Sequence, residues 1–167
     1  MIASFPGSNV RGAGFAGGRV FLATGDSTSP LAYTSLDGTT TVTLLAVPPL
    51  GTGATARIPA NDYYTSPFLP TPQGDGLYFR ASDPTTSILV FGTARPADIM
   101  YIDASTATPT VSNLSAFSSP LDVTDWSVSH FQDDPYRAVS PAGSRCCFAT
   151  GLTDVSTGLW LVDRTAP

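Results

Sequence analysis

A short apolar stretch bounded by glycine occurs more than once in this chain, and any fold has to accommodate every copy. Residues 17–25 read GGRVFLATG and residues 143–151 read GSRCCFATG, with the same residue at five of the nine positions. A weaker third copy, DGLYFRASD, covers residues 75–83. Apolar runs of this length between glycine or aspartate are typical of buried β-strands. A chain of 167 residues built on such a unit is expected to form one domain of strands.

Each copy leads into a second strand-like segment, so the repeated unit is a strand, a turn and a strand. Asp37-Gly38 is a hairpin-turn dipeptide that follows the first of these second segments. The second segments are residues 31–35, 98–103 and 158–163. The stretches that begin with the first two of these segments align with each other when one residue is inserted. The alignment matches Tyr33 with Tyr101, Val42 with Val111 and Leu45 with Leu114.

The composition favours strands over helices. The chain has no lysine and no glutamate, and 13% of its residues are charged, about half the usual fraction of roughly 25%. Lysine and glutamate are good helix formers, whereas threonine and the other β-branched residues favour strands and glycine, proline and serine favour turns. We therefore predict an all-β fold with little or no helix. The strands are expected to form an antiparallel sandwich or barrel from repeated strand-turn-strand units.

Proline and glycine gather between the predicted strands. Residues 47–58, 63–76 and 133–141 are the segments in which they concentrate, and we expect long ordered loops there. The glycine-rich start of the chain, residues 1–16, predicts an extended N-terminal arm. Residues 17–167 then form a single all-β domain.

Charge and hydropathy argue against several classes of partner. The net charge is -5, whereas binding to a phosphate backbone needs clustered cations, so we expect no nucleic-acid partner. No apolar run approaches the ~18 residues of a membrane-spanning helix, so we expect no membrane partner. The start, MIASFPGSNV, has no basic segment followed by an apolar run, so we expect no signal peptide.

The chain has two cysteines, which are adjacent. Cys146 and Cys147 occupy the positions of Val20 and Phe21 in the matched stretch. Neighbouring residues of a strand point to opposite faces, which disfavours a shared metal or redox site. We therefore interpret the two cysteines as small apolar residues of a core strand.

Residues 25–27, Gly-Asp-Ser, resemble the nucleophile block of GDSL/SGNH hydrolases. That resemblance implies Ser27 as nucleophile, Asn61 in the asparagine block and His130 as base. The family has an aspartate three residues before its histidine, where this chain has Ser127, and its fold is α/β. We therefore predict that the chain is not an enzyme, and that Gly-Asp-Ser is a turn after a strand.

Metal and cofactor sites find little support. His130 is the single histidine, whereas a zinc site needs several convergent ligands. Residues 133–136, Asp-Asp-Pro-Tyr, supply two carboxylates, whereas calcium takes six or more oxygens. A turn before proline explains that segment better. We expect no metal and no cofactor.

Several aromatic residues fall in or near predicted loops. Such side chains anchor protein interfaces, stack on sugars, or pack beneath the loops that carry them. We favour packing or a protein interface over a ligand site. The candidate interface residues are Phe5, Tyr63, Tyr64, Phe68, Trp126, Phe131 and Tyr136.

The repeated unit resembles a blade of the TolB-like β-propellers. SPAGSRCCFATG followed by GLWLVDRT, from Ser140, is similar to that family's SPDG-strand-strand-D pattern, although Ala142 stands where the family has aspartate. The stretch from Ser66 is similar as well. This resemblance implies a carbohydrate- or protein-binding module. Three blades do not close a propeller, which needs about four or more, so either the units belong to another β fold or several chains assemble.

In size and composition the chain also resembles bacteriophage capsid decoration proteins, which are poor in charge and rich in strands, glycine, threonine and proline. This resemblance implies a non-catalytic structural protein of the virion, assembled in the host cytoplasm, that stabilises junctions between shell subunits. Its partners would be capsid or other assembly subunits. A symmetric homo-oligomer, a trimer by preference, would suit the symmetric junctions of a shell.

Overall fold

The structure of the chain is a computed structural model. It describes residues 10, 12–24, 31–37, 39, 41–56, 58, 68–82, 97–116, 139–150 and 158–165, with the backbone alone at 97, 148–150 and 158–160. Within these residues there are ten strands and no helix, and neighbouring strands pair antiparallel throughout. The predicted all-β fold is therefore confirmed.

The strands form three sheets, each following the order of the chain. The first sheet contains β1 (Gly12–Ala16), β2 (Arg19–Ala23), β3 (Leu31–Ser35) and β4 (Thr43–Leu44). The second contains β5 (Phe68–Pro70), β6 (Gly76–Ser82), β7 (Ala97–Asp103) and β8 (Thr110–Asn113). The third contains β9 (Arg145–Thr150) and β10 (Gly158–Asp163), and Val139 bridges to Cys146 on the free side of β9.

The three sheets are successive copies of one unit, which we call repeat 1 (residues 12–45), repeat 2 (68–114) and repeat 3 (139–165). The same backbone hydrogen bond marks the start of the central hairpin in each. It runs from Leu36 N to Gly18 O at 3.1 Å, from Ala104 N to Asp75 O at 2.8 Å and from Arg164 N to Ser144 O at 2.9 Å.

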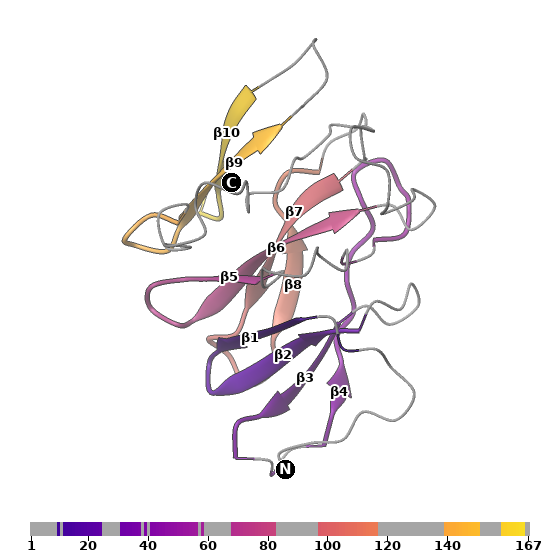
Figure 1. Ribbon diagram of the computed structural model, residues 1–167, viewed down its shortest axis with the longest axis vertical. Helices are drawn as coiled ribbons and strands as arrows, with labels where there is room; N and C mark the ends of the chain where they lie inside the picture. The colour runs from indigo at the N-terminus through magenta and orange to yellow at the C-terminus, as the bar shows by residue number, and fades with distance from the viewer. Residues whose placement is uncertain are drawn as a thin grey trace.

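The repeats stack in chain order, with repeat 2 between the other two (Figure 1). One core cluster joins repeats 1 and 2, and it includes Phe21, Tyr33, Leu77 and Ile102. A second cluster joins repeat 2 to repeat 3 through residues such as Tyr78, Tyr101, Cys146 and Val162. Of the two arrangements expected, face-to-face packing of sheets is the one observed.

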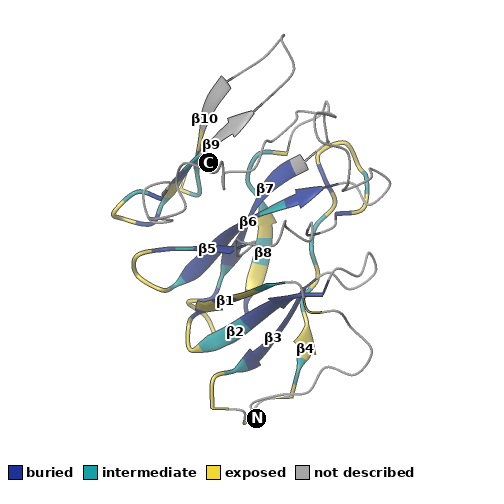
Figure 2. Cartoon of the chain, viewed as in Figure 1, coloured by how far each residue is buried: buried dark blue, intermediate teal, exposed yellow. Residues whose placement is uncertain are grey.

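Strict alternation along β6 and β7 explains how repeat 2 fills both layers. Leu77 and Phe79 lie in the first cluster, whereas Tyr78, between them, lies in the second. On β7, Met100 and Ile102 alternate with Ile99 and Tyr101 in the same way. Successive side chains of a strand point to opposite faces, so these near-continuous apolar runs fit a sheet covered on both sides. Figure 2 shows β6 and β7 buried over most of their described length.

The expected N-terminal arm, residues 1–16, overlaps the first sheet. Gly12–Ala16 is strand β1, paired with β2 over its whole length, so these five residues belong to the sheet. Residues 1–9 and 11 lie outside the described residues. Gly14 explains why the glycine-rich sequence is compatible with packing. A Cβ at Gly14 would lie 2.8 Å from the Cβ of Phe68, so the close contact with repeat 2 requires glycine.

The predicted loop at residues 47–58 is described at 47–56 and 58, and residues from both of these parts pack against the core. Leu50, Ala56 and Ile58 are buried in the first cluster. The carboxylate of Asp98 at the start of β7 fixes the loop, because its Oδ2 accepts from the backbone N–H of Gly51 at 2.7 Å and from the side chain of Asn113 at 2.9 Å.

Candidate interaction surface

Each repeat presents two different faces to its neighbours. We call the face that packs on the following repeat the forward face, and the face that packs on the preceding repeat the rear face. Cross-strand pairs at equivalent positions define both. The forward-face pairs are Phe21 with Tyr33, Tyr78 with Tyr101 and Cys147 with Leu161, and the rear-face pairs are Val20 with Thr34, Leu77 with Ile102 and Cys146 with Val162.

Aromatic pairs fill the forward faces of repeats 1 and 2. The ring centroids of Phe21 and Tyr33 are 5.7 Å apart, and those of Tyr78 and Tyr101 are 4.9 Å apart. Both distances are in the range at which tilted aromatic pairs attract. The tyrosine hydroxyl of Tyr78 is also satisfied, because it donates to the backbone O of Gly143 in repeat 3 at 2.8 Å. Burial raises the pKa of Tyr78 above its ordinary value, so the phenol stays protonated and keeps this bond.

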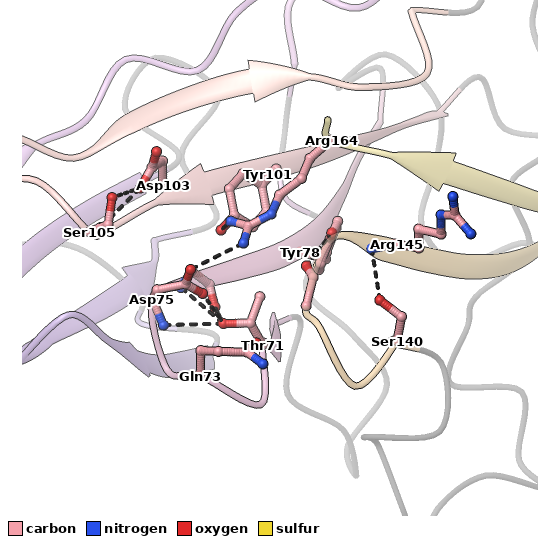
Figure 3. A network of polar contacts seen from close by, with 12 residues as sticks. Thr71, Gln73, Asp75, Tyr78, Tyr101, Asp103, Ser105, Ser140, Arg145 and Arg164 are labelled. Atoms are coloured by element: carbon pink, nitrogen blue, oxygen red, sulfur yellow. Dashed lines mark hydrogen bonds and ion pairs between the residues drawn. The ribbon is translucent and has the colours of Figure 1, made fainter. Parts of the chain in front are cut away.

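Arg164 of repeat 3 reaches back over the forward face of repeat 2 (Figure 3). Its guanidinium carbon lies 4.7 Å from the ring centroid of Tyr101, and the guanidinium also donates to the Tyr101 hydroxyl. Its Nη2 lies 3.1 Å from Asp75 Oδ2. An arginine over an aromatic face with a carboxylate beside it combines cation–π attraction and an ion pair. This contact joins residues 89 positions apart and is a polar link between repeats 2 and 3.

The environment of Asp75 favours its charged form. Partial burial alone raises the pKa of this carboxyl, but the hydrogen bonds from Thr71 and Arg164 and the guanidinium charge outweigh burial and leave the pKa below its ordinary value of 3.8. The hydroxyl of Thr71 donates to Asp75 Oδ1 at 2.6 Å. Asp75 is thus a carboxylate paired with one cation, Arg164, and this ion pair has a structural role.

The turns at the start of the hairpins also contact one another from repeat to repeat. The backbone N of Gly17 donates to Gly74 O at 2.7 Å. Gln73 Nε2 donates to Pro141 O at 2.6 Å. Gly17, Gly74 and Gly143 all have positive φ, at 53°, 67° and 70°. These glycines permit the left-handed turn that brings the repeats into register.

An aspartate–hydroxyl hydrogen bond recurs where the third strand of each repeat ends. Asp103 accepts from Ser105, Asp163 accepts from Thr165, and in repeat 1 the order is reversed, with Ser35 donating to Asp37. These bonds measure 2.6 Å. Hydrogen bonds led by Thr165 lower the pKa of Asp163 to about 2, and hydrogen bonds led by Ser35 do the same for Asp37. The bonds terminate strands, so these aspartates have a structural role.

The outer faces of the stack carry exposed apolar residues. On the forward face of repeat 3, Leu161 is 57% exposed and Cys147 is partly exposed. On the rear face of repeat 1, Phe15 is 60% exposed and Leu44 is 64% exposed. Phe15 pairs with Val20 and Leu44 with Ala32, which places both on that face. At the centre of the rear face of repeat 1, Leu22, Ala32 and Thr34 are buried, so the exposed residues there lie at its margins. Leu161, with Phe15 and Leu44 at those margins, forms the candidate interaction surface.

Cys146 has the predicted character of a core residue, whereas Cys147 is partly exposed. Both are free, and Cys146 is buried against repeat 2 while Cys147 lies on the opposite face. Burial, together with the neighbouring Cys147, raises the pKa of Cys146 to about 12, so the thiol is protonated near neutral pH. The interpretation of Cys146 as a small apolar core residue at the position of Val20 is confirmed.

Most of the predicted site residues lie outside the described residues. These are the interface candidates Phe5, Tyr63, Tyr64, Trp126, Phe131 and Tyr136, the hydrolase-like Ser27, Asn61 and His130, and the acidic segment 133–136. Phe68 is described, and it is 4% exposed in the core between repeats 1 and 2. For Phe68 the structure therefore gives packing within the chain.

Sequence reasoning missed Leu161, Leu36, Phe15 and Arg164. No local pattern distinguishes an apolar residue on an outer face from one between repeats. Extending the match of Tyr33 with Tyr101 to repeat 3 would have assigned Leu161 to the same face.

Searches of protein-family models, of curated proteins and of solved structures find no match for this chain. In the described part of the chain, no three histidine, cysteine or acidic residues gather into a metal-binding group. The same part contains no helix long and apolar enough to cross a membrane.

Proposed function

We propose that this chain is a non-catalytic protein-interaction module, working as a structural component of a larger protein assembly. The observation that supports the proposal is the pair of outer faces. Leu161, Phe15 and Leu44 are large apolar residues that are more than half exposed. Leu161 is equivalent to Tyr101, which is buried between repeats 2 and 3, whereas Phe15 and Leu44 lie at the margins of the rear face of repeat 1. Apolar patches that continue a packing surface are typical of association sites.

The blade-like architecture supports a β-propeller-like module. In repeats 1 and 2, four antiparallel strands follow one another in chain order, and the sheets stack face to face. Propellers use four-stranded sheets of this kind as their blades. The described aromatic pairs, Phe21 with Tyr33 and Tyr78 with Tyr101, are buried between repeats, so among the described aromatic side chains Phe15 is the one with an exposed ring. A protein ligand suits the exposed Leu161 and Leu44 better than a carbohydrate does, because both side chains are aliphatic.

Capsid decoration is the narrower form of the proposal. The low fraction of charged residues and the absence of lysine suit a surface that loses its water on assembly, because each buried ammonium would need a partner. In this form the outer faces lie against shell subunits of a virion. Mixing the purified chain with candidate shell particles, followed by sedimentation, tests it: the chain is expected to move into the particle fraction.

The non-catalytic part of the proposal is tested with a chromogenic short-chain ester. We expect the same hydrolysis rate from the purified chain and from its Ser27→Ala variant, both at the rate of buffer alone. An ester hydrolysis that Ser27→Ala abolishes, in a variant with unchanged circular dichroism, would overturn the proposal and favour the hydrolase interpretation.

A further inference from the structure

Resting on the proposed function, we propose that β10 binds an extended segment of a partner protein as an added strand. The segment binds along the edge of β10 that faces away from β9, which we call the open edge. It pairs antiparallel with β10, as β4 pairs with β3 and β8 pairs with β7. Binding of this kind takes its affinity from backbone hydrogen bonds and its specificity from alternate side chains.

Within the described residues, repeat 3 has counterparts of the first three strands of repeat 2 and none of the fourth. β9 and β10 are equivalent to β6 and β7, and Val139 bridges to Cys146 where Pro70 of β5 pairs with Leu77. β8 pairs with the far side of β7, whereas the sheet of β9 and β10 has two strands. The open edge of β10 is therefore the position in repeat 3 that β8 occupies in repeat 2.

The backbone of β10 directs hydrogen-bonding groups to this edge at every second residue. Arg164 N donates to Ser144 O at 2.9 Å, just beyond one end of the strand pair. From that bond, the alternation of an antiparallel pair directs the backbone of Val162 toward β9, and the backbone of Leu161 and Asp163 away from it. An N–H and a C=O of both residues thus face the open edge. A row of such groups is a template for pairing with another strand.

Repeats 1 and 2 use the equivalent groups to bind their fourth strands. Leu45 N of repeat 1 donates to Leu31 O at 3.0 Å, and Leu114 N of repeat 2 donates to Ile99 O at 2.9 Å. The residue equivalent to these two acceptors is Leu159, two positions before Leu161 on β10. The same alternation directs the backbone carbonyl of Leu159 to the open edge.

The side chain at the middle of the open edge is apolar. Leu161 is 57% exposed, whereas the equivalent Tyr33 and Tyr101 on β3 and β7 are buried. β4 and β8, which end their sheets, place the exposed hydroxyl residues Thr43 and Ser112 opposite those tyrosines. β10 thus carries the side chain of an inner strand at the edge of its sheet.

The charges at this edge already balance each other. Asp163 Oδ2 accepts from Arg145 Nε at 2.7 Å, and Asp163 Oδ1 accepts from the hydroxyl of Thr165 at 2.6 Å. A charged residue in the bound segment would lose water without gaining a partner there. The bound segment is therefore uncharged, as β4 and β8 are.

The side chains of β4 and β8 define the sequence that fits. Residues 42–45 read Val-Thr-Leu-Leu and residues 111–114 read Val-Ser-Asn-Leu. Both contain valine, then a hydroxyl residue, then a variable residue, then leucine. Val111 packs against the core between repeats 1 and 2, whereas Leu114 packs against the core between repeats 2 and 3. The valine and the leucine of the pattern thus cover opposite faces of the sheet.

We therefore expect the partner segment to contain Val-Thr-x-Leu or Val-Ser-x-Leu, where x is any uncharged residue. In the register of β8 on β7, its valine pairs with Val162, its hydroxyl residue with Leu161 and its leucine with Leu159. Pairing gives Leu161 a neighbouring strand, as Tyr101 has Ser112 beside it.

The first test uses a synthetic peptide of residues 109–115, Pro-Thr-Val-Ser-Asn-Leu-Ser, which contains β8. In the free chain, the amide of Leu161 should exchange with solvent faster than that of Val162, which bonds to β9. We expect saturable binding of the peptide, and exchange at Leu161 that is slower by about tenfold or more at saturation. Nuclear magnetic resonance measures both. The same peptide with Ser112→Pro lacks the N–H that donates to Leu161 O, and it should not bind.

Leu161→Pro blocks the open edge from the side of the protein. It removes an N–H that points away from β9, and proline is tolerated on edge strands at such positions. Leu161→Ala is the matched control, since it shortens the side chain and keeps the N–H. We expect Leu161→Pro to abolish peptide binding and Leu161→Ala to retain it, with circular dichroism verifying that both variants are folded.

Slow exchange of the Leu161 amide in the free chain, no binding of the peptide, or equal binding of its Ser112→Pro form would overturn strand addition. A mass of two chains that Leu161→Pro returns to one chain would overturn it as well, because the open edge would then bind a second copy. If the peptide fails to bind and the chain still moves onto shell particles, the proposed function survives without this inference. Hydrolysis that depends on Ser27 would instead remove the proposed function itself.

Discussion

At the scale of single residues, glycine at the hairpin turns decides whether two repeats can approach. A Cβ at Gly17 would lie 2.1 Å from the backbone O of Ala104 in repeat 2, whereas a Cβ at Gly18 meets nothing within 4 Å. Both glycines have positive φ. A residue with a Cβ would therefore strain the backbone at both positions, and only at Gly17 would it also disturb the contact between repeats 1 and 2.

We predict that Gly17→Ala destabilises the chain more than Gly18→Ala does. Gly18→Ala should cost about 1–2 kcal/mol, the strain of a left-handed conformation for an L-residue. Gly17→Ala should cost at least about 1 kcal/mol more, because repeats 1 and 2 have to separate slightly. Urea unfolding of both variants measures the difference. Equal losses would show that repeats 1 and 2 are not in contact at this turn.

The residue types in the sequence were enough to align the second halves of repeats 1 and 2. The predicted matches of Tyr33 with Tyr101, Val42 with Val111 and Leu45 with Leu114 are confirmed, because Leu45 N bonds to Leu31 O as Leu114 N bonds to Ile99 O. For the weaker copy, which lies in repeat 2, the sequence alignment was wrong by one residue. It placed Asp75 opposite Gly17, whereas Gly74 is the residue equivalent to Gly17 and Gly143.

At the scale of elements, the link between repeats 2 and 3 depends on pH through Asp75. Its carboxyl has a lowered pKa in the folded chain, so its charge stabilises the fold at pH values above the ordinary pKa of 3.8. That stabilisation is lost as the pH falls below 3.8 and through the lower pKa of the folded state.

We predict that the wild-type chain loses more unfolding free energy between pH 6 and pH 3 than Asp75→Asn does. The difference should be about 1 kcal/mol or less, because the ion pair with Arg164 is partly exposed. Asp37 and Asp163 titrate in both proteins and cancel in the comparison. Parallel losses in the two proteins would contradict a stabilising role for the Asp75 charge.

The bounds of the strands could be predicted from the sequence, whereas the side-chain contacts between repeats could not. The expected segments 31–35 and 158–163 are the observed β3 and β10, because glycine, proline and aspartate delimit apolar runs. The pairing of Arg164 with Asp75 has no local signal, since it depends on how two sheets stack. The N-terminal glycines suggested an arm, and close packing of Gly14 on Phe68 is what makes them a strand instead.

At the scale of the whole molecule, the repeats differ in how well they are covered. Within the described residues, repeat 2 packs against another repeat on both faces, whereas repeats 1 and 3 each pack against another repeat on one face. Stability in stacked repeats is approximately the sum of each repeat and its contacts with neighbours. The middle repeat should therefore be the most stable part of the chain.

Amide hydrogen exchange tests the stack of forward on rear faces most directly. The account predicts that amides of β6 and β7, including those of Tyr78 and Tyr101, exchange most slowly and only through global unfolding. Amides of β9 and β10 should exchange faster. The substitution Leu161→Arg, which places a charge on the forward face of repeat 3, should leave the slow exchange of β6 and β7 unchanged. Exchange in β6 and β7 as fast as in β9 and β10 would contradict a middle repeat that is packed on both sides.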